Sequence, residues 1–419
     1  MARLVMKFGG TSVANVDRIK TVARHVKREV DAGHQVAVIV SAMAGATNQL
    51  VAWTRETAQL HDAREYDAIV ASGEQVTSGL LAVALQEIGI PARSWQGWQI
   101  PIKTNDAHGS ARIEAIAGDR LIERFEEGQV AVIAGFQGIS PSGRITTLGR
   151  GGSDTSAVAI AAAVMADRCD IYTDVDGVYT TDPRIVSQAR RLNRISYEEM
   201  LEMASLGAKV LQTRSVEMAM NHHVPVLVRS SFVEPEDLTP AFAGTDLATG
   251  TLVCDEDEIV EQQIVSGIAY SKDEAKVTLV KVEDKPGVAA RVFGPLADAN
   301  INVDMIVQNV SEDGKHTDMT FTVPVADFQR AAKVIEEARA DIGYKEMRGS
   351  TDVVKVSVIG VGMRSHAGVA AKMFTALADR GINIQAITTS EIKVSILIDA
   401  AYTELAVRTL HSVYGLDKA

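Results

Sequence analysis

An internal repeat in the last third of this 419-residue chain limits the folds that are open to it. Lys285–Phe293 aligns with His366–Phe374, and Ile301–Val303 aligns with Ile382–Ile384, at a constant offset of 81 residues. Each copy has the pattern of a strand, a glycine turn, a helix, a turn with asparagine, a strand, and then another helix and strand. This order is typical of a small βαββαβ ferredoxin-like module. We therefore expect two copies of one such module at the C-terminal end.

The segment before the repeat has a different pattern. Short β-rich runs alternate with amphipathic segments such as Val16–Val30, where apolar residues recur at helical spacing. This alternation predicts an α/β fold with a largely parallel sheet and helices on both faces. The expected strands are Leu4–Phe8, Val36–Val40, Val130–Ala134, Asp170–Thr173 and Val224–Val228, the expected helices include Gln75–Gly89 and Thr155–Ala166, and Ser196–Glu199 forms a capping box.

The regular alternation ends after Ser231. Pro235 and Pro240 lie in a polar stretch that ends with the acidic run Asp255–Glu258, a composition typical of a solvated linker. We therefore predict an N-terminal domain at residues 1–231, a linker at 232–263, and modules at 264–345 and 346–419.

Composition excludes several classes of protein. Lys and Arg total 42 against 54 Asp and Glu, which argues against nucleic acid as the main partner because phosphate binding needs excess positive charge. The longest apolar run, Ala157–Ala166, has ten residues, whereas a membrane span needs about 18. The N-terminus does not have the pattern of a signal peptide, and the two cysteines, Cys169 and Cys254, indicate buried thiols in a reducing compartment. We expect a cytoplasmic protein.

Common phosphate-loop and metal-site patterns are absent from the sequence. No P-loop spelling occurs, and Gly149–Asp154 departs from the dinucleotide fingerprint at Asp154. The histidines lack metal-site spacing, and the adjacent His222 and His223 favour capping or packing over metal binding.

Glycine-rich segments instead follow several expected strands. They are Lys7–Ser12, Ser41–Thr47, Gly135–Gly138 with Thr147–Thr155 downstream, and Thr173–Arg184. Ligands of open α/β sheets bind outside the carboxyl ends of the strands, and glycines let backbone N–H groups approach an anion. With Lys7 and Arg150 among them, these segments predict a nucleotide phosphate site.

Four motifs together resemble those of the aspartate kinases in the amino-acid kinase superfamily: Lys7–Ser12, Ser72–Gln75, Thr147–Thr155 and Thr173–Arg184. The resemblance covers essentially the whole chain, because the repeated modules are similar to the tandem ACT domains that such enzymes carry for feedback control. It implies phosphoryl transfer from ATP to the β-carboxylate of L-aspartate, which gives 4-phospho-L-aspartate on the route to lysine, threonine and methionine. A carboxylate with a pKa of about 3.9 is already ionised at pH 7, so the reaction needs alignment and charge neutralisation rather than a general base.

The resemblance also implies roles for individual residues. Lys7 would stabilise charge on the transferring group, and Asp154 would orient lysine side chains and help organise Mg²⁺–ATP, with the metal held mainly by ATP. Arg150 would bind the substrate α-carboxylate and Glu74 its ammonium group. Ser41 and Thr47 would line the same pocket, and the nucleotide would contact Lys7, Gly9, Gly10, Thr11, Ser12, Gly152, Ser153, Thr173, Asp174, Tyr179, Asp182, Arg184 and Lys209.

In the related family, amino-acid effectors bind where loops of two modules meet. By that resemblance, Asp304 or Glu391 would pair with a lysine ammonium group, and a threonine would bind between Gly287–Ala289 and Asn383–Ile384. The expected effector contacts are Asp284, Gly287, Val288, Ala289, Asn302, Asp304, Gln308, Val369, Asn383, Ile384, Ser390 and Glu391. We expect lysine, threonine or both as inhibitors, and self-association through the modules into at least a homodimer.

Two other functions remain open at this point. One is another amino-acid kinase, acting on glutamate or N-acetylglutamate, although the Glu74 and Arg150 motifs and the paired modules favour aspartate. The other is a catalytically inactive amino-acid sensor, against which the presence of Lys7 and Asp154 argues.

Overall fold

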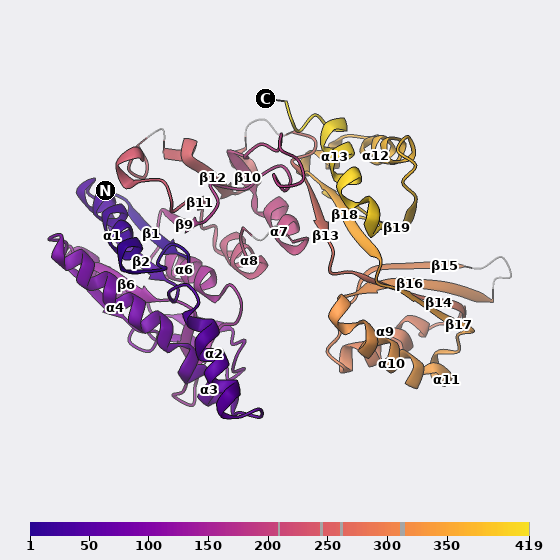
Figure 1. Ribbon diagram of the computed structural model, residues 1–419, viewed down its shortest axis with the longest axis horizontal. Helices are drawn as coiled ribbons and strands as arrows, with labels where there is room; N and C mark the ends of the chain where they lie inside the picture. The colour runs from indigo at the N-terminus through magenta and orange to yellow at the C-terminus, as the bar shows by residue number, and fades with distance from the viewer. Residues whose placement is uncertain (208–209, 244–245, 260–262, 311–314, 419) are drawn as a thin grey trace. The chain divides into compact units, whose positions relative to one another are not determined.

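The computed structural model describes residues 1–207, 210–243, 246–259, 263–310 and 315–418 (Figure 1). The chain divides into two compact units. The first contains residues 1–178, 191–205 and 209–260, and the second contains residues 179–190, 206–208 and 261–419.

An eight-stranded sheet forms the centre of the first unit. Its order is β10-β12-β11-β9-β1-β2-β6-β3, and its only antiparallel pair among the described strands is β11 with β12. The predicted, largely parallel sheet is thus confirmed. The strands are β1 (Arg3–Phe8), β2 (Gln35–Val40), β3 (Ala92–Trp95), β6 (Val130–Ala134), β9 (Arg168–Thr173), β10 (Arg194–Ser196), β11 (Val226–Ser230) and β12 (Gly250–Cys254).

Helices cover both faces of this sheet. α1 (Val16–Asp31) and α4 (Ser72–Glu87) pack on one face, where Leu4 and Met6 of β1 share a core with Leu81 and Leu85 of α4. α6 (Gly152–Ala163) contacts β1, β2 and β9, and its first ten residues are buried, which explains the continuous apolar run in the sequence. The other helices of this unit are α2 (Ala46–Thr57), α3 (Ala63–Val70), α5 (Asp119–Glu126), α7 (Tyr197–Ser205) and α8 (Thr213–His222).

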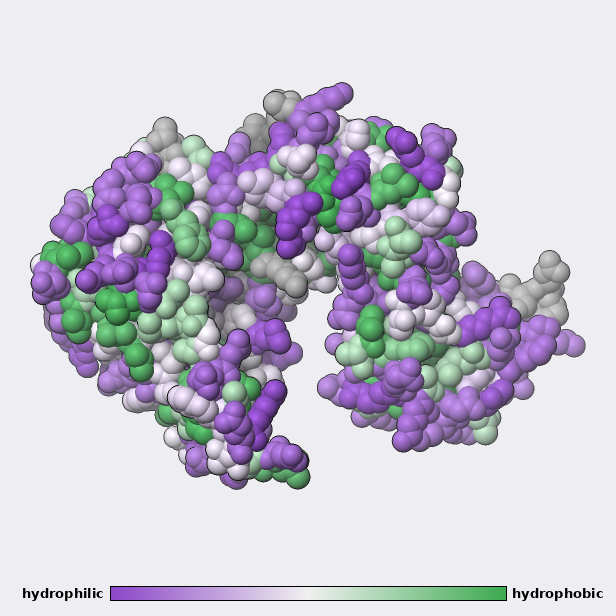
Figure 2. Space-filling view, viewed as in Figure 1, coloured by the Kyte–Doolittle hydropathy of each residue, from purple (hydrophilic) through white to green (hydrophobic). Residues whose placement is uncertain are grey.

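The α3–α4 segment is more apolar than a typical surface helix pair. Ala63–Glu87 spans 25 residues and contains an 18-residue window with a mean hydropathy of 1.4, and it is the one segment within the described ranges that is long and apolar enough to cross a membrane. Half of that window is buried, and α4 packs against α1, β3 and β6. The exposed apolar side chains of α4, Val76, Leu80 and Val83, contribute to the hydrophobic surface over this helix (Figure 2). The segment is therefore accounted for as a packed part of this unit.

A second, smaller sheet was not expected from the sequence. It has the order β5-β4-β7-β8, formed by β4 (Ile102–Thr104), β5 (Ile113–Ile116), β7 (Gln137–Ile139) and β8 (Ile145–Thr147). Strands of three or four residues are too short for a clear alternating pattern. α3 packs against β8, which leads directly into the turn that carries Arg150.

The structure corrects the interpretation of residues 232–263 as a solvated linker. Gly250–Cys254 forms the buried strand β12 between β10 and β11 in the large sheet. The first unit therefore extends well beyond Ser231. Residues 231–243, which we call the strap, lie against α1: Arg28 donates to the carbonyl of Pro235, and Glu29 accepts from the N–H of Ala241 at 2.7 Å.

The second unit contains two four-stranded sheets. One follows the predicted βαββαβ order and has the strand order β15-β16-β14-β17, whereas the other has the order β13-β18-β20-β19. The first is built from β14 (Ala275–Glu283), α9 (Val288–Asp298), β15 (Asp304–Val310), β16 (His316–Val323), α10 (Phe328–Glu337), α11 (Arg339–Ile342) and β17 (Glu346–Ser350). The second is built from β13 (Gly267–Ser271), β18 (Val353–Ile359), α12 (Val369–Ala378), β19 (Ile384–Thr389), β20 (Lys393–Asp399) and α13 (Thr403–Val413).

The two modules are nested rather than consecutive, which corrects the boundaries at 264 and 345. β13 precedes the first module in sequence but pairs with β18 of the second, from Gly267 opposite Ile359 to Ser271 opposite Lys355. β17, which lies beyond the predicted end of the first module, pairs with β14. The repeat did not reveal that β13 belongs to the second module, because edge-strand pairing depends on partners distant in sequence.

Candidate active site

A buried ion pair connects Lys7 of β1 with Asp154 in the first turn of α6. Lys7 Nζ lies 2.5 Å from Asp154 Oδ1, and their side chains are 10% and 11% exposed. Lys7 is directed to this face because alternate residues of a strand point to opposite sides, and Met6 and Phe8 fill the core with α1 and α4. The carboxylate holds the ammonium group in place while leaving N–H donors for a phosphate.

The glycine segment after β1 packs against the end of β2. Gly9 donates its N–H to the carbonyl of Tyr172 at 3.3 Å, and a Cβ on Gly10 would lie 3.1 Å from the carbonyl oxygen of Ala42. Ser12 is buried, and its hydroxyl donates to that of Ser231 at 2.8 Å, whereas the Thr11 side chain is exposed. A side chain at residue 10 would therefore crowd the segment that follows β2.

Glu74 lies buried in the first turn of α4. Its Oε1 accepts from the N–H of Ala42 at 3.0 Å, and its Oε2 has no hydrogen-bond partner among the described residues. Burial raises the pKa of Glu74 to about 7. A Cβ on Gly73 would lie 2.7 Å from that of Ala42, so α4 begins in close contact with the segment that contains Ser41. An unpaired buried carboxylate oxygen is suited to a cationic ligand.

The turn between β8 and α6 exposes the side chain of Arg150. Gly151 has φ of +69°, and a Cβ there would lie 1.9 Å from Cγ of Gln212, so both backbone conformation and space require glycine. Gly152 and Ser153 follow as the first residues of α6. The Gly152 N–H donates to the carbonyl of Gly149 at 3.0 Å, whereas the Ser153 N–H lies in the first turn, where helix N–H groups lack intrahelical acceptors and favour an anion.

The remaining substrate candidates lie beside these segments. Ser41 follows β2 and donates its N–H to the carbonyl of Phe8 at 3.1 Å, and Thr47 is in the first turn of α2. The contacts of Ala42 with Gly10 and Glu74 bring the Lys7 and Glu74 motifs to one edge of the sheet.

The predicted nucleotide contacts are divided between the two units. Thr173 ends β9, and its hydroxyl donates to the adjacent Asp174 at 3.2 Å. Tyr179, Asp182 and Arg184 belong to the second unit. There Asp182 accepts from Tyr270 at 3.2 Å, and a hydrogen bond from Arg184 is the main cause that lowers the pKa of Asp182. Lys209 lies outside the described residues.

The part of the chain that the structure describes contains no group of three or more His, Cys, Asp or Glu side chains that could hold a metal ion. Asp154 is paired with Lys7, and Asp174 is exposed at the end of β9. A Mg²⁺ ion here would need most of its oxygen ligands from nucleotide phosphates and water, an arrangement that Mg²⁺ commonly adopts.

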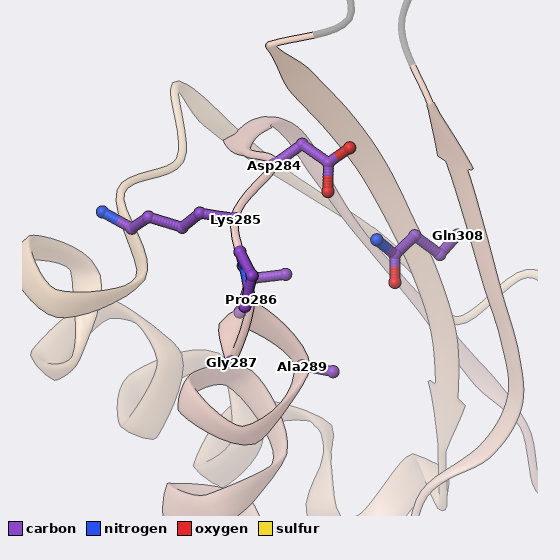
Figure 3. Close-up of a pocket in the computed structure, with 7 residues that line it drawn as sticks. Asp284, Lys285, Pro286, Gly287, Ala289 and Gln308 are labelled. Atoms are coloured by element: carbon purple, nitrogen blue, oxygen red, sulfur yellow. The ribbon is translucent and has the colours of Figure 1, made fainter.

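The first C-terminal module contains an open pocket of about 450 Å³ at the N-terminus of α9. Gly287, with φ of +89°, forms the turn that begins α9. Figure 3 shows the Asp284 carboxylate and the Gln308 amide pointing toward one another across this pocket, whereas Lys285 points away. Its lining includes five predicted effector residues: Asp284, Gly287, Val288, Ala289 and Gln308.

The other effector candidates lie elsewhere in the second unit. Asp304 begins β15 and already has an ammonium partner, because Lys355 Nζ lies 2.6 Å from its carboxylate and 2.5 Å from that of Glu274. Burial raises the pKa of Asp304, but the hydrogen bond and charge of Lys355 outweigh this and leave it below its usual value. The remaining candidates are Asn302, just before β15; Val369, whose carbonyl accepts from Tyr414; Asn383 and Ile384 at the start of β19; and the exposed Ser390 and Glu391 between β19 and β20.

Sequence reasoning missed the residues that support the Arg150 turn. Asp67 of α3 accepts a hydrogen bond from the Thr147 hydroxyl at 2.5 Å. Arg214 donates to the carbonyls of Leu148 and Ala111 at 2.9 and 2.8 Å. The signal for Asp67 in the sequence is its position just before the apolar residues Ala68–Ala71, which by itself does not identify its partners.

Comparison with known protein families agrees with this architecture. Residues 2–230 match the model of the amino acid kinase family, and residues 276–343 and 356–414 each match an ACT domain model. The fold and the site therefore define an amino-acid kinase with two ACT domains.

Similarity to individual proteins shows which family within this class the chain resembles. An aspartate kinase of Stutzerimonas stutzeri is 53% identical over 418 residues, which cover 100% of this chain and 98% of that protein. The aspartokinase of Pseudomonas aeruginosa is also 53% identical, with the same coverage. The crystal structure of E. coli aspartokinase III with aspartate and ADP is 30% identical, has a TM-score of 0.79, and is matched over 98% of this chain and 99% of that one. The chain belongs to the aspartate kinase family.

Proposed function

We propose that this aspartate kinase transfers the γ-phosphoryl group of ATP to the β-carboxylate of L-aspartate and is regulated by lysine, threonine or both at its ACT domains. The observation that carries the catalytic part is the buried Lys7–Asp154 pair at the sheet edge where Glu74 presents an unpaired carboxylate oxygen. A cation for the phosphates and an anion for an ammonium group thus lie on neighbouring segments.

Lys7 and the start of α6 act on the phosphate side of the reaction. The substrate carboxylate is ionised at neutral pH and needs no base, so catalysis depends on alignment and on neutralising charge at the transferring group. Lys7, held by Asp154, donates to phosphate oxygens, and the Ser153 N–H at the start of α6 binds the same charge. Mg²⁺, when bound with ATP, supplies further charge neutralisation.

Glu74 and Arg150 act on the amino-acid side. Glu74 binds the α-ammonium group, and this cation favours the ionised form of a carboxyl group whose pKa is about 7 without ligand. Arg150 is exposed and presents a guanidinium group that binds the α-carboxylate through two parallel hydrogen bonds. Ser41 and Thr47 provide hydroxyl groups beside them.

The pocket at the α9 N-terminus supports effector binding in the first ACT domain. Helix N–H groups and the Gln308 amide suit the carboxylate of an amino acid, and Asp284 suits its ammonium group. A lysine effector that uses Asp304 has to displace Lys355 from it. Inhibition requires tighter binding to the less active state, typically by about 1–3 kcal/mol.

Aspartate-dependent ATP turnover, measured with lysine, threonine, both or neither, tests this proposal. We expect turnover with aspartate and not with glutamate or N-acetylglutamate, trapping of the acyl phosphate as a hydroxamate, and inhibition by at least one effector. Turnover of another acid in preference to aspartate, or no turnover at all, would overturn the catalytic assignment. Identical kinetics with and without both amino acids would overturn the effector assignment.

The proposal also concerns the self-association of the chain and its location in the cell. We infer that the chain forms at least a homodimer through its ACT domains, which light scattering coupled to size exclusion measures directly. We also infer a cytoplasmic location, because Cys169 and Cys254 are free and buried.

A further inference from the structure

Asp67 is a fully buried carboxylate that none of the steps above uses. It lies on α3 with 0% exposure, and its partners come from two other segments of the first unit. His108 Nδ1 lies 2.7 Å from Oδ2, the Gly109 N–H donates at 3.0 Å, and the Thr147 hydroxyl donates to Oδ1 at 2.5 Å. These donors satisfy both carboxylate oxygens.

The chemistry of this cluster fixes the direction of each hydrogen bond. An ionised carboxylate only accepts, so His108 must carry its proton on Nδ1, and the Thr147 hydroxyl must point toward Asp67. Burying a charge in this way is unfavourable unless it is hydrogen-bonded, and bonds to an ionised acceptor are stronger than neutral ones. The cluster therefore ties three segments together firmly.

One of these segments is the turn that carries Arg150. Thr147 is the last residue of β8, and its carbonyl accepts from the N–H of Ala111 at 2.9 Å. Gly149 has φ of +77°, and a Cβ there would lie 3.2 Å from the carbonyl oxygen of Gly109. The loop with His108 and the turn with Arg150 thus lie in contact, with Asp67 bonded to both.

Asp67 is also connected to the helix that carries Glu74. Asp67 and Glu74 are seven residues apart on α3 and α4, which meet at Ala71. The carbonyl of Ala71 accepts from Gln137 Nε2 at 3.0 Å, so the junction is held in place. A shift of α3 relative to β8 would therefore change the spacing between Glu74 and Arg150.

We propose that Asp67 is a positioning residue for aspartate: it sets the distance between the group that binds the α-ammonium and the group that binds the α-carboxylate. The inference rests on the proposed roles of Glu74 and Arg150. Asp67 acts through the Thr147 hydroxyl and the His108 loop, and it touches neither substrate. ATP is held by Lys7 and the start of α6, and α6 is anchored separately by its packing against β1, β2 and β9, so we expect ATP binding to depend far less on this spacing.

The Asp67→Asn variant tests the proposal in the full-length enzyme. An amide has the same shape but carries no charge, and its N–H₂ group replaces one of the two acceptor oxygens, so the cluster is weakened without a cavity. We expect the aspartate KM to rise about tenfold or more, while the ATP KM changes less than twofold. The wild-type preference for aspartate over its α-amide, which lacks the charge that Arg150 binds, should fall by a similar factor. Asp62→Asn, at the exposed N-cap of the same helix, is the matched control because asparagine caps equally well.

A second variant keeps the test valid if Asp67→Asn does not fold. Thr147→Val removes only the hydroxyl and should raise the aspartate KM in the same direction by a smaller factor. An unchanged aspartate KM in a folded Asp67→Asn protein, or equal increases in both KM values, would overturn the positioning role. Arg150→Ala separates this outcome from failure of the proposed function, because an unchanged aspartate KM in that variant would overturn the assignment of Arg150 itself.

Discussion

At the scale of single residues, Glu74 shows how binding function opposes stability. Its carboxyl group is buried, and one of its oxygens has no hydrogen-bond partner among the described residues. Such a group is unfavourable in the free enzyme and becomes favourable when an ammonium group arrives. The same burial makes both stability and substrate binding depend on pH.

Glu74→Gln should reveal this opposition. The folded-state pKa of about 7 lies above the ordinary value of 4.5, so Glu74 favours the folded state less as pH rises through this window. The unfolding free energy of the variant, relative to wild type, should therefore increase by on the order of 3 kcal/mol between pH 4.5 and pH 8. Urea unfolding at several pH values measures this. The aspartate KM should rise at least tenfold at pH 8; no change in either quantity would contradict the role of Glu74.

Lys7→Ala should separate catalysis from stability in a similar way. Loss of the ammonium group should lower kcat by about two to three orders of magnitude, and it leaves Asp154 buried without its partner. The double variant Lys7→Ala with Asp154→Ala should regain stability but not turnover. Steady-state kinetics and thermal unfolding of the three proteins measure both effects. Near-normal turnover in folded Lys7→Ala would show that phosphoryl transfer does not depend on this lysine.

At the scale of elements, the strap is held to α1 by buried ionic contacts. Glu29 has 0% exposure, is ion-paired with Arg28, and accepts from the N–H of Ala241. Arg18 also binds the strap through the carbonyl and hydroxyl of Ser231, whose hydroxyl accepts from Ser12 of the predicted phosphate-binding segment. The strap thus connects α1 with the predicted phosphate-binding segment that contains Ser12.

Glu29→Ala should release the strap. Removing one partner of a buried ion pair typically destabilises by about 3–5 kcal/mol, and here an N–H group also loses its acceptor. We expect a lower unfolding free energy and new proteolytic cleavage within residues 231–243. Asp31→Ala on the same helix is the control, because its pair with Lys27 is exposed. Equal protection of the strap in both variants would show that Glu29 does not hold it.

At the scale of the whole molecule, the nesting of one ACT domain inside the other determines what can be separated. Without β13, the sheet of the second domain would lose the edge strand that pairs with β18. Lys355 of β18 also joins Glu274 and Asp304, which lie in or next to the inserted domain. The two domains are therefore expected to depend on one another for stability.

Two fragments test this dependence. Residues 263–419 contain every strand of both sheets and should unfold in one cooperative transition. Residues 346–419 lack β13 and retain β17 without its sheet, so they should be largely unfolded or aggregated. Circular dichroism and denaturant unfolding distinguish the two results. A stable 346–419 fragment would contradict the importance of β13 for the second domain.

The sequence predicted the alternation of strands and helices in the parallel sheet, the two repeated modules and the glycine segments around Lys7, because these depend on local periodicity and backbone conformation. The reciprocal capping box of Ser196 and Glu199 is one confirmed example, with both hydrogen bonds at 3.2 Å. Only the tertiary structure decided that Gly250–Cys254 joins the large sheet, that β13 completes the sheet of the second module, and that Asp67 connects the Glu74 helix with the Arg150 turn. Strand pairing and buried charge clusters join segments distant in sequence, and a local pattern places no constraint on which distant partner is chosen.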